Sequence, residues 1–359
     1  MASISTPRQR AQAFCERFAL RIPILQAPMA GACPASLAIA VGRAGGMGGF
    51  GGVLSKPDGI TDWAREVRQG SNGAFQINLW IPDPPPVRDE GHETDVRAFL
   101  GQWGPEVAAS AGENTPPDFA AQCQAMLDAG PAVVSSIMGI YPPEFVSELK
   151  ARGIAWFANA TTVAEAIQAE AAGADVIVAQ GFEAGGHRGA FDAAAAEQGL
   201  VGLFALIPAI ADRVRIPIVA TGAIGDGRGV AAALILGASA AQIGSALLRC
   251  PEAQTHPVWS DALDGLKPED TQPTRAFSGR LGRAVANAYT RAAAGPHAPR
   301  PSPYPVHRGL TSGLRQAAAA ENDASRMQMW AGQGAGLARA EPAADFVQRI
   351  WAEAEALLG

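Results

Sequence analysis

The sequence predicts an α/β protein folded as a (β/α)8 TIM barrel, and two observations lead to that fold class. Short apolar runs that end in Gly- or Pro-marked turns alternate with Ala-rich segments of helical length along most of the chain, a pattern typical of parallel βα units. Eight such runs are found, the number of strands that closes this kind of barrel. An open, doubly wound Rossmann sheet is the alternative, because counting strands does not prove closure.

The expected elements follow one another in order along the chain. Strands are predicted at residues 22–28, 46–50, 75–79, 132–136, 154–157, 176–180, 216–220 and 240–243. Helices are predicted at residues 34–44, 60–68, 118–129, 143–151, 162–172, 200–214 and 227–236. Thr162 can cap the helix that begins near Val163, and Gly173 can end it. A last amphipathic helix over residues 343–358 is expected to pack on the exterior of the barrel.

Two insertions interrupt the repeat. The barrel is expected to comprise residues 1–250 and 335–359. A Pro-rich insertion, 81–117, follows the third strand, and a second insertion, 251–334, follows the eighth strand and is expected near the active-site mouth. Active sites of such barrels lie at the C-terminal ends of the strands, so the Pro-rich segment is placed to border one. A surface excursion without a role is the alternative for this segment.

Composition excludes several classes of function. Of the 359 residues, 48% are hydrophobic and 17% charged, which is typical of a compact globular protein. The net charge of −6 argues against a nucleic-acid partner, which would require clustered basic residues. Four cysteines without CxxC spacing, and the absence of a signal peptide or a long apolar stretch, predict a cytoplasmic protein without membrane spans. The histidines lack metal-ligand spacing, so no metal site is predicted.

The seventh and eighth strands both run into small residues. Gly222 follows the seventh strand, and the eighth ends in the run Gln242, Ile243, Gly244 and Ser245. Turns of this kind expose backbone N–H groups, and in a barrel these two neighbouring turns commonly hold a phosphate. A phosphorylated cofactor is therefore predicted. The alternative is that the glycines only allow tight turns between strand and helix.

The sixth strand is followed by a histidine among glycines. Gly185, Gly186 and Gly189 surround His187 and permit the close approach of a flat ligand. With an ordinary pKa near 6.5, a histidine at the mouth of the barrel is suited to take or share a proton at neutral pH. Its alternative is a loop histidine without a role.

Side chains after the first and third strands are expected to face the same mouth. Met29 could lie against an aromatic ring system, and Asn78 could hydrogen-bond the edge of a heterocycle. A core filler and a turn residue are the respective alternatives. Glu183, Arg188 and Asp226, near these loops, are expected to form local ion pairs or helix caps, with Asp226 as an N-cap.

Several segments together resemble the nitronate monooxygenase family, formerly grouped as 2-nitropropane dioxygenases, over most of the chain. They are QAPMAG at 26–31, AGGMG at 44–48, GFEAGGHRG at 181–189, ATGAI at 220–224, QIGS at 242–245, FSGR at 277–280 and MWAGQ at 329–333. The run around His187 is the most specific of these. The Pro-rich insertion departs from compact members of the family.

The resemblance implies an FMN enzyme. It implies FMN contacts at Asn78, Gln180, Gly185, Gly222, Gln242, Ile243, Gly244 and Ser245, with Met29 and Gly186 also lining the flavin. Ser245 stands where many members have Thr and retains the hydroxyl, and His187 matches the catalytic histidine. The implied reaction is oxidation of alkyl nitronates by FMN and dioxygen, giving a carbonyl compound and nitrite. His187 would either hydrogen-bond the nitro oxygens or abstract the α-proton of a nitroalkane.

Two other functions stay open at this point. FMN-dependent enoyl-acyl carrier protein reductases have a similar Gly-Gly-His loop, and they would require NADH or NADPH. A non-catalytic flavin- or phosphate-binding barrel, in which His187 only stabilises a loop, is the alternative from another class. The sequence does not indicate an oligomeric state.

Overall fold

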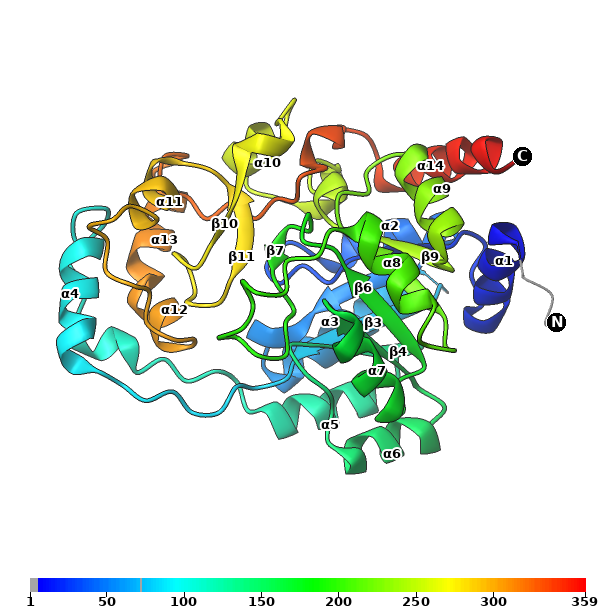
Figure 1. Cartoon of the computed structure of the whole chain (residues 1–359), viewed down its shortest axis with the longest axis horizontal. Helices are drawn as coiled ribbons and strands as arrows, with labels where there is room; N and C mark the ends of the chain where they lie inside the picture. The colour runs from blue at the N-terminus through cyan, green and yellow to red at the C-terminus, as the bar shows by residue number, and fades with distance from the viewer. Residues whose placement is uncertain (1–5, 72) are drawn as a thin grey trace.

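The structure is a computed structural model, which describes residues 6–71 and 73–359. Within these residues, eight parallel strands form one sheet at the centre of the molecule (Figure 1). They are β1 (Ile24–Gln26), β2 (Gly48–Gly51), β3 (Phe75–Trp80), β4 (Val133–Ile137), β5 (Ala155–Ala160), β6 (Val176–Gln180), β8 (Ile218–Thr221) and β9 (Ala240–Ile243). The order β1-β9-β8-β6-β5-β4-β3-β2 confirms all eight expected strands.

Hydrogen bonds between the first and last strands of this order close the sheet. Leu25 and Met47 form a parallel bridge. The Gln26 N–H donates to the Met47 carbonyl at 2.8 Å, and the Met47 N–H donates to the Ile24 carbonyl at 3.0 Å. A Cβ at Gly49 would lie 2.4 Å from the Gln26 carbonyl oxygen, so only glycine fits at this seam. The fold is therefore a (β/α)8 barrel, as predicted. The alternative, an open Rossmann sheet, is wrong.

Helices cover the outside of the barrel. They are α2 (Ala35–Ala44), α3 (Pro57–Gly70), α5 (Phe119–Ala129), α6 (Pro143–Ala151), α7 (Val163–Ala171), α8 (Leu203–Ala211), α9 (Gly227–Leu236) and α14 (Ala343–Leu358). All the expected helices are found: α6, α9 and α14 have the expected bounds, and the others have shifted ends. Helix α3 begins earlier than expected because Pro57 occupies its first turn, where the missing N–H costs nothing. The last helix packs on the exterior as expected, with Phe346 and Ile350 buried in the layer between strands and helices.

A helix that the sequence did not predict closes the bottom of the barrel. Helix α1 (Pro7–Phe18) places Phe14 and Phe18 against Phe157 of β5, with ring centroids 6.1 Å and 5.0 Å away. These rings are buried together with residues from the first halves of the barrel strands. The bottom of the barrel is thus packed core, and ligands must enter at the opposite end.

The two insertions pack together into one unit, which we call the outer lobe (residues 81–117 and 251–334). It contains α4 (Glu90–Leu100), α10 (Pro257–Ala262), β10 (Thr271–Thr274), β11 (Gly282–Val285), α11 (Ala288–Ala293), α12 (Val306–Leu310) and α13 (Ser312–Ala320). Val96 and Leu100 of α4 share a core with Phe277, Tyr289 and Leu310. Figure 1 shows α4 (cyan) beside α12 and α13 (orange), at the end of the molecule away from the chain termini.

A short second sheet joins the outer lobe to the barrel. Strand β7 (Gly186–His187) pairs antiparallel with β11, which pairs with β10. His187 lies opposite Gly282 in this register, so the glycine loop after β6 is held from outside the barrel. In the part of the chain that the structure describes, no helix combines the length and hydropathy needed to cross a membrane.

Candidate active site

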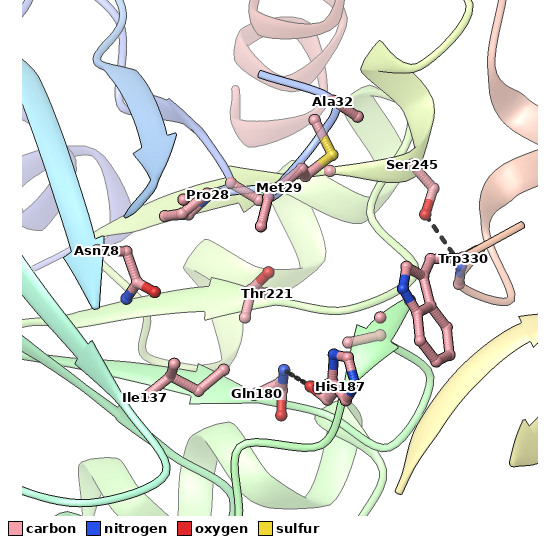
Figure 2. A pocket seen from close by; sticks show the side chains of 18 of the residues that line it. Pro28, Met29, Ala32, Asn78, Ile137, Gln180, His187, Thr221, Ser245 and Trp330 are labelled. Carbon is pink, nitrogen blue, oxygen red and sulfur yellow. Dashed lines mark hydrogen bonds between the residues drawn. The ribbon is translucent and has the colours of Figure 1, made fainter. Parts of the chain in front are cut away.

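A cavity of about 430 Å³ lies at the C-terminal ends of the barrel strands, beneath the outer lobe (Figure 2). Ten of the eleven residues expected at the site line it: Met29, Asn78, Gln180, Gly185, Gly186, His187, Gly222, Gln242, Gly244 and Ser245. The exception is Ile243, which is 1% exposed and packs in the layer between strands and helices. Among the described residues, none from the Pro-rich segment 81–117 lines the cavity. Trp80, which immediately precedes this segment, does line it.

Free backbone donors gather where β8 and β9 end, and we call this group the phosphate cradle. It consists of the N–H groups of Gly222, Ala223, Gly244 and Ser245, which donate to no acceptor within residues 6–71 and 73–359. Gly222 has φ +135° and Ala223 has φ +53°, so the first turn is bent away from regular structure. Backbone N–H groups converging in this way form an anion site.

The hydroxyl of Ser245 adds a donor to the cradle. Its Oγ accepts a hydrogen bond from the Gly332 N–H at 2.9 Å, which leaves the hydroxyl proton free to donate. Gly332 comes from the end of the outer lobe, so this bond also ties the lobe to the barrel. Figure 2 shows Ser245 with this bond, close to Trp330.

Two amide side chains offer complementary groups to a heterocycle. Asn78 donates from Nδ2 to Ser135 Oγ at 3.0 Å, which leaves its Oδ1 as an acceptor. Gln242 accepts at Oε1 from Gln76 Nε2 at 2.9 Å, which leaves its own Nε2 as a donor. Both residues line the cavity. This donor and acceptor suit the polar edge of a flavin or another flat heterocycle.

Gln180 holds the histidine loop. Its Nε2 donates to the His187 carbonyl at 3.0 Å, and its Oε1 accepts from the Gly189 N–H at 2.8 Å. Both polar atoms of the amide therefore form hydrogen bonds within the protein. The main role of Gln180 at the cavity is to position the histidine loop. A Cβ at Gly185 would lie 2.4 Å from the Gly332 nitrogen, so this position of the loop accepts only glycine.

The imidazole of His187 contacts two indole rings. Its centroid is 4.6 Å from the ring of Trp80 and 4.7 Å from the ring of Trp330. Figure 2 shows Trp330 directly beside it. Its Nε2 lies 2.7 Å from the Oγ of Ser278, a residue that is 0% exposed. The ring is thus held by packing against two indoles and by a hydrogen bond at one nitrogen.

The environment of His187 favours the neutral imidazole. Its pKa is lowered to about 3, chiefly because burial removes water from the imidazolium, and also because Arg308 and Arg280 repel it. At neutral pH the ring therefore carries one proton. It can accept or donate one hydrogen bond to a ligand, and it is uncharged while doing so.

Two guanidinium groups give the cavity a positive potential. Arg308 and Arg315 line it, and in the described part of the chain neither forms an ion pair with a carboxylate. The pKa of Arg315 is lowered to about 10, first by burial and then by repulsion from Arg308. Arg280 differs, because it is 3.1 Å from Asp83 of the Pro-rich segment. Unpaired, partly buried cations of this kind favour an anionic ligand.

Comparison with known proteins identifies the family. The family model described as nitronate monooxygenase matches residues 12–353. The chain belongs to the nitronate monooxygenase family. A nitronate monooxygenase from Paraburkholderia phytofirmans is 40% identical over 334 residues, covering 91% of each chain.

Solved structures extend the likeness to the fold. The nitroalkane oxidase from Streptomyces ansochromogenes superposes with a TM-score of 0.86 at 35% identity, covering 97% of this chain and 100% of that one. FabK from Thermotoga maritima gives a TM-score of 0.75 at 26% identity, covering 99% of this chain and 98% of that one. The resemblance to nitronate monooxygenases stated from the sequence is confirmed.

Two of the three residues expected to form local ion pairs or helix caps near this nitronate monooxygenase site do so. Glu183 accepts hydrogen bonds from the Leu203 N–H at the start of α8, and Asp226 caps α9 by accepting from the Gly229 N–H at 3.1 Å. For Arg188 the expectation is wrong. Its guanidinium is buried and donates to the backbone carbonyls of Gln180, Thr161 and Gly199 rather than to a carboxylate.

Sequence reasoning missed the outer-lobe half of this nitronate monooxygenase cavity. Tyr304, Arg308, Arg315 and Trp330 line it, and Ser278 binds the histidine from behind. The position of Trp80 could have been predicted, because it ends a barrel strand and such residues lie at the mouth. Ser278 and Trp330 also had a usable signal, because they stand in the FSGR and MWAGQ segments of an insertion expected near the mouth. Tyr304, Arg308 and Arg315 stand in no such segment.

Proposed function

We propose that this member of the nitronate monooxygenase family oxidises alkyl nitronates with FMN and dioxygen, giving a carbonyl compound and nitrite, and that it also accepts nitroalkanes. The observation that carries the proposal is the neutral His187 in a cavity with two unpaired arginines and a phosphate cradle. The names of the relatives at 35–40% identity support the same substrate class. They do not favour the enoyl reductase or the non-catalytic alternative.

The cavity fits FMN at both ends. The phosphate cradle and the Ser245 hydroxyl would hold the phosphate, and Asn78 and Gln242 offer hydrogen bonds to a flavin ring. Gly186 has φ +74° and open space where a Cβ would lie, so the histidine loop leaves room beside it for a flat ring. When bound, FMN supplies the electron acceptor for the nitronate and passes the electrons to dioxygen.

The protein's own groups bind and orient the substrate. Arg308 and Arg315 attract the nitronate anion into the cavity that they line. The Nδ1 of His187 has no partner in the described part of the chain, so it is the ring nitrogen that a substrate oxygen or α-carbon would meet. The indoles of Trp80 and Trp330 keep the imidazole in place. We expect the enzyme to act in the cytoplasm on a small nitronate, and its four free, buried cysteines agree with a reducing compartment.

Flavin absorbance tests the proposal directly. The purified protein, loaded with FMN, is mixed anaerobically with an alkyl nitronate and, in a separate sample, with NADPH. Bleaching by the nitronate, and nitrite release once oxygen is admitted, is the expected result. Bleaching by NADPH alone would favour the reductase, and no bleaching by either would favour a flavin-binding protein without this activity.

Removal of one unpaired charge should weaken nitronate binding. We expect Arg308→Gln to raise the KM for an alkyl nitronate roughly tenfold, the effect of losing one charge-assisted hydrogen bond. The salt dependence of kcat/KM should also decrease, because fewer fixed charges attract the anion. Arg291→Gln is the matched control, since Arg291 is an exposed arginine of the outer lobe on α11. An unchanged KM in Arg308→Gln would show that this arginine does not meet the substrate.

A further inference from the structure

We propose that Asn159 is a further flavin-binding residue, whose side-chain amide donates a hydrogen bond to a carbonyl oxygen of the pyrimidine ring of FMN and stabilises the reduced ring. The inference rests on the proposed function, which places FMN in the cavity. It adds a residue that was not among those expected at the site.

The amide of Asn159 is buried without a hydrogen bond. The residue stands near the end of β5, is 6% exposed and lines the cavity. No hydrogen bond joins either of its amide atoms to another residue within 6–71 and 73–359. Of the buried side-chain atoms in this part of the chain that have no partner, Asn159 Nδ2 is the one on a residue that lines the cavity. Burial of an unpaired amide costs free energy, so we expect its partner to be a ligand of the cavity.

The amide packs against a glycine of the histidine loop. A Cβ at Gly189 would lie 2.1 Å from Asn159 Nδ2 and 2.8 Å from Ile137 Cγ1, so only glycine leaves room for the amide there. The oxygen and nitrogen of the amide exchange places by a half-turn about one bond, and no partner in the described chain fixes which of them faces the cavity. Asn159 can therefore turn its NH2 group toward an acceptor in the cavity.

The place of β5 in the barrel indicates which part of FMN the amide meets. The phosphate cradle lies at the ends of β8 and β9. In the closed order of strands, β3 stands four places from β8 and β4 stands four places from β9, which is directly across the mouth, and β5 is next to β4. Figure 2 shows Asn78 and Ile137 on one side of the cavity and Ser245 on the other. A flavin with its phosphate in the cradle therefore points its ring toward β3, β4 and β5.

The side chains on that side suit the pyrimidine ring of the flavin better than its dimethylbenzene ring. Asn78 of β3 offers Oδ1 as an acceptor, and Ser135 of β4 accepts from Asn78 Nδ2, which leaves the serine hydroxyl proton without an acceptor in the described chain. The pyrimidine ring has one N–H group and two carbonyl oxygens. Asn78 can accept from the N–H, so the carbonyl oxygens remain for the donors, which are Ser135 and Asn159.

A donor at a carbonyl oxygen of this ring also affects electron uptake. The carbonyl oxygens gain negative charge when the ring is reduced, and a hydrogen bond to a more negative acceptor is stronger. Asn159 should therefore stabilise reduced FMN more than oxidised FMN. This raises the midpoint potential of the bound coenzyme.

FMN titration and potentiometry test the assignment. Asn159→Leu keeps a similar side-chain volume and removes both polar atoms, and Asn159→Ala shortens the side chain so that nothing new can clash. We expect either variant to bind oxidised FMN roughly fivefold more weakly. Reduced FMN should lose roughly another tenfold in affinity, so the two-electron midpoint potential should fall by about 30 mV. A residue that only supports the fold would change both affinities equally and leave the potential as it is.

Ser302→Ala is the matched control. Ser302 is 1% exposed and its Oγ has no partner in the part of the chain that the structure describes, but it does not line the cavity. This variant should change neither the affinity for FMN nor the midpoint potential.

A midpoint potential equal to that of the wild type in both Asn159 variants would overturn the proposal. An apoprotein that binds no FMN would overturn it as well. If the potential depends on Asn159 but no nitronate is oxidised, the proposed function fails and the assignment of Asn159 stands.

Discussion

Replacement of His187 by alanine should lower kcat/KM for an alkyl nitronate by on the order of 100- to 1000-fold while FMN remains bound. This is the loss typically caused by removing one preorganised hydrogen-bonding group from an active site. The ring of His187 is held by three contacts, with Trp80, Trp330 and Ser278. The alanine variant keeps the phosphate cradle, which lies on other strands, so flavin content should match the wild type. Steady-state kinetics and the flavin spectrum measure the two effects separately.

The pH profile adds a second readout for the same residue. Because the pKa of His187 is lowered to about 3, the ring stays neutral from pH 5 to 8, and kcat/KM should show no limb near pH 6.5 from this group. His256→Ala is the control, since His256 binds the Ala319 carbonyl and does not line the cavity. Full turnover in His187→Ala, or a limb near pH 6.5 that vanishes in His187→Gln, would contradict the role given to the histidine.

The second large effect is expected at the phosphate cradle. Gly222→Ala should weaken FMN binding roughly 10- to 100-fold, because φ +135° is a conformation that residues with a Cβ adopt only under strain of about 1–3 kcal/mol. Space is not the cause, since the new Cβ would lie 3.4 Å from its nearest neighbour, the Ala184 nitrogen. The backbone must instead rotate, and this turns the N–H groups of Gly222 and Ala223 away from the ligand. Titration of the apoprotein with FMN measures the loss.

A glycine outside the cavity controls for backbone strain alone. Gly153 has φ +69° in the turn before β5, and a Cβ added there would meet no atom within 4 Å. Gly153→Ala should lower thermal stability modestly and leave FMN affinity unchanged. Equal FMN affinity in Gly222→Ala and the wild type would show that this turn does not bind the phosphate.

The barrel could be predicted because its signals are local. Strands at 176–180 and 240–243 match β6 and β9 at both ends, because short, mostly apolar runs are typical of strands that are buried on both faces. The phosphate cradle and the histidine loop could be predicted for the same reason, because glycines after a strand mark the mouth of a barrel. Ile243 was placed at the site because it stands in the QIGS run, but side chains alternate along a strand and this one points to the helices.

The other half of the site depends on contacts between distant segments. Ser278 and Trp330 reach His187 only because β7, a strand of two residues, pairs with β11. Nothing in the sequence of Gly186 and His187 predicts a strand, since two residues carry no periodicity. Likewise, α4 shares a core with α12 through side chains that are far apart in the chain. Long-range packing of this kind has no local pattern, so the sequence did not predict how the two insertions pack against each other.

The two walls of the cavity come from different parts of the chain, so we expect the barrel to retain the coenzyme and the outer lobe to select the compound that is oxidised. Gly222 and Gly244 belong to the barrel, whereas Tyr304 and Arg308 stand on the outer lobe. Exchange of residues 251–330 between relatives would therefore alter which carbon skeletons are accepted and leave flavin loading intact. The bond from Gly332 to Ser245 marks where such a graft should stop.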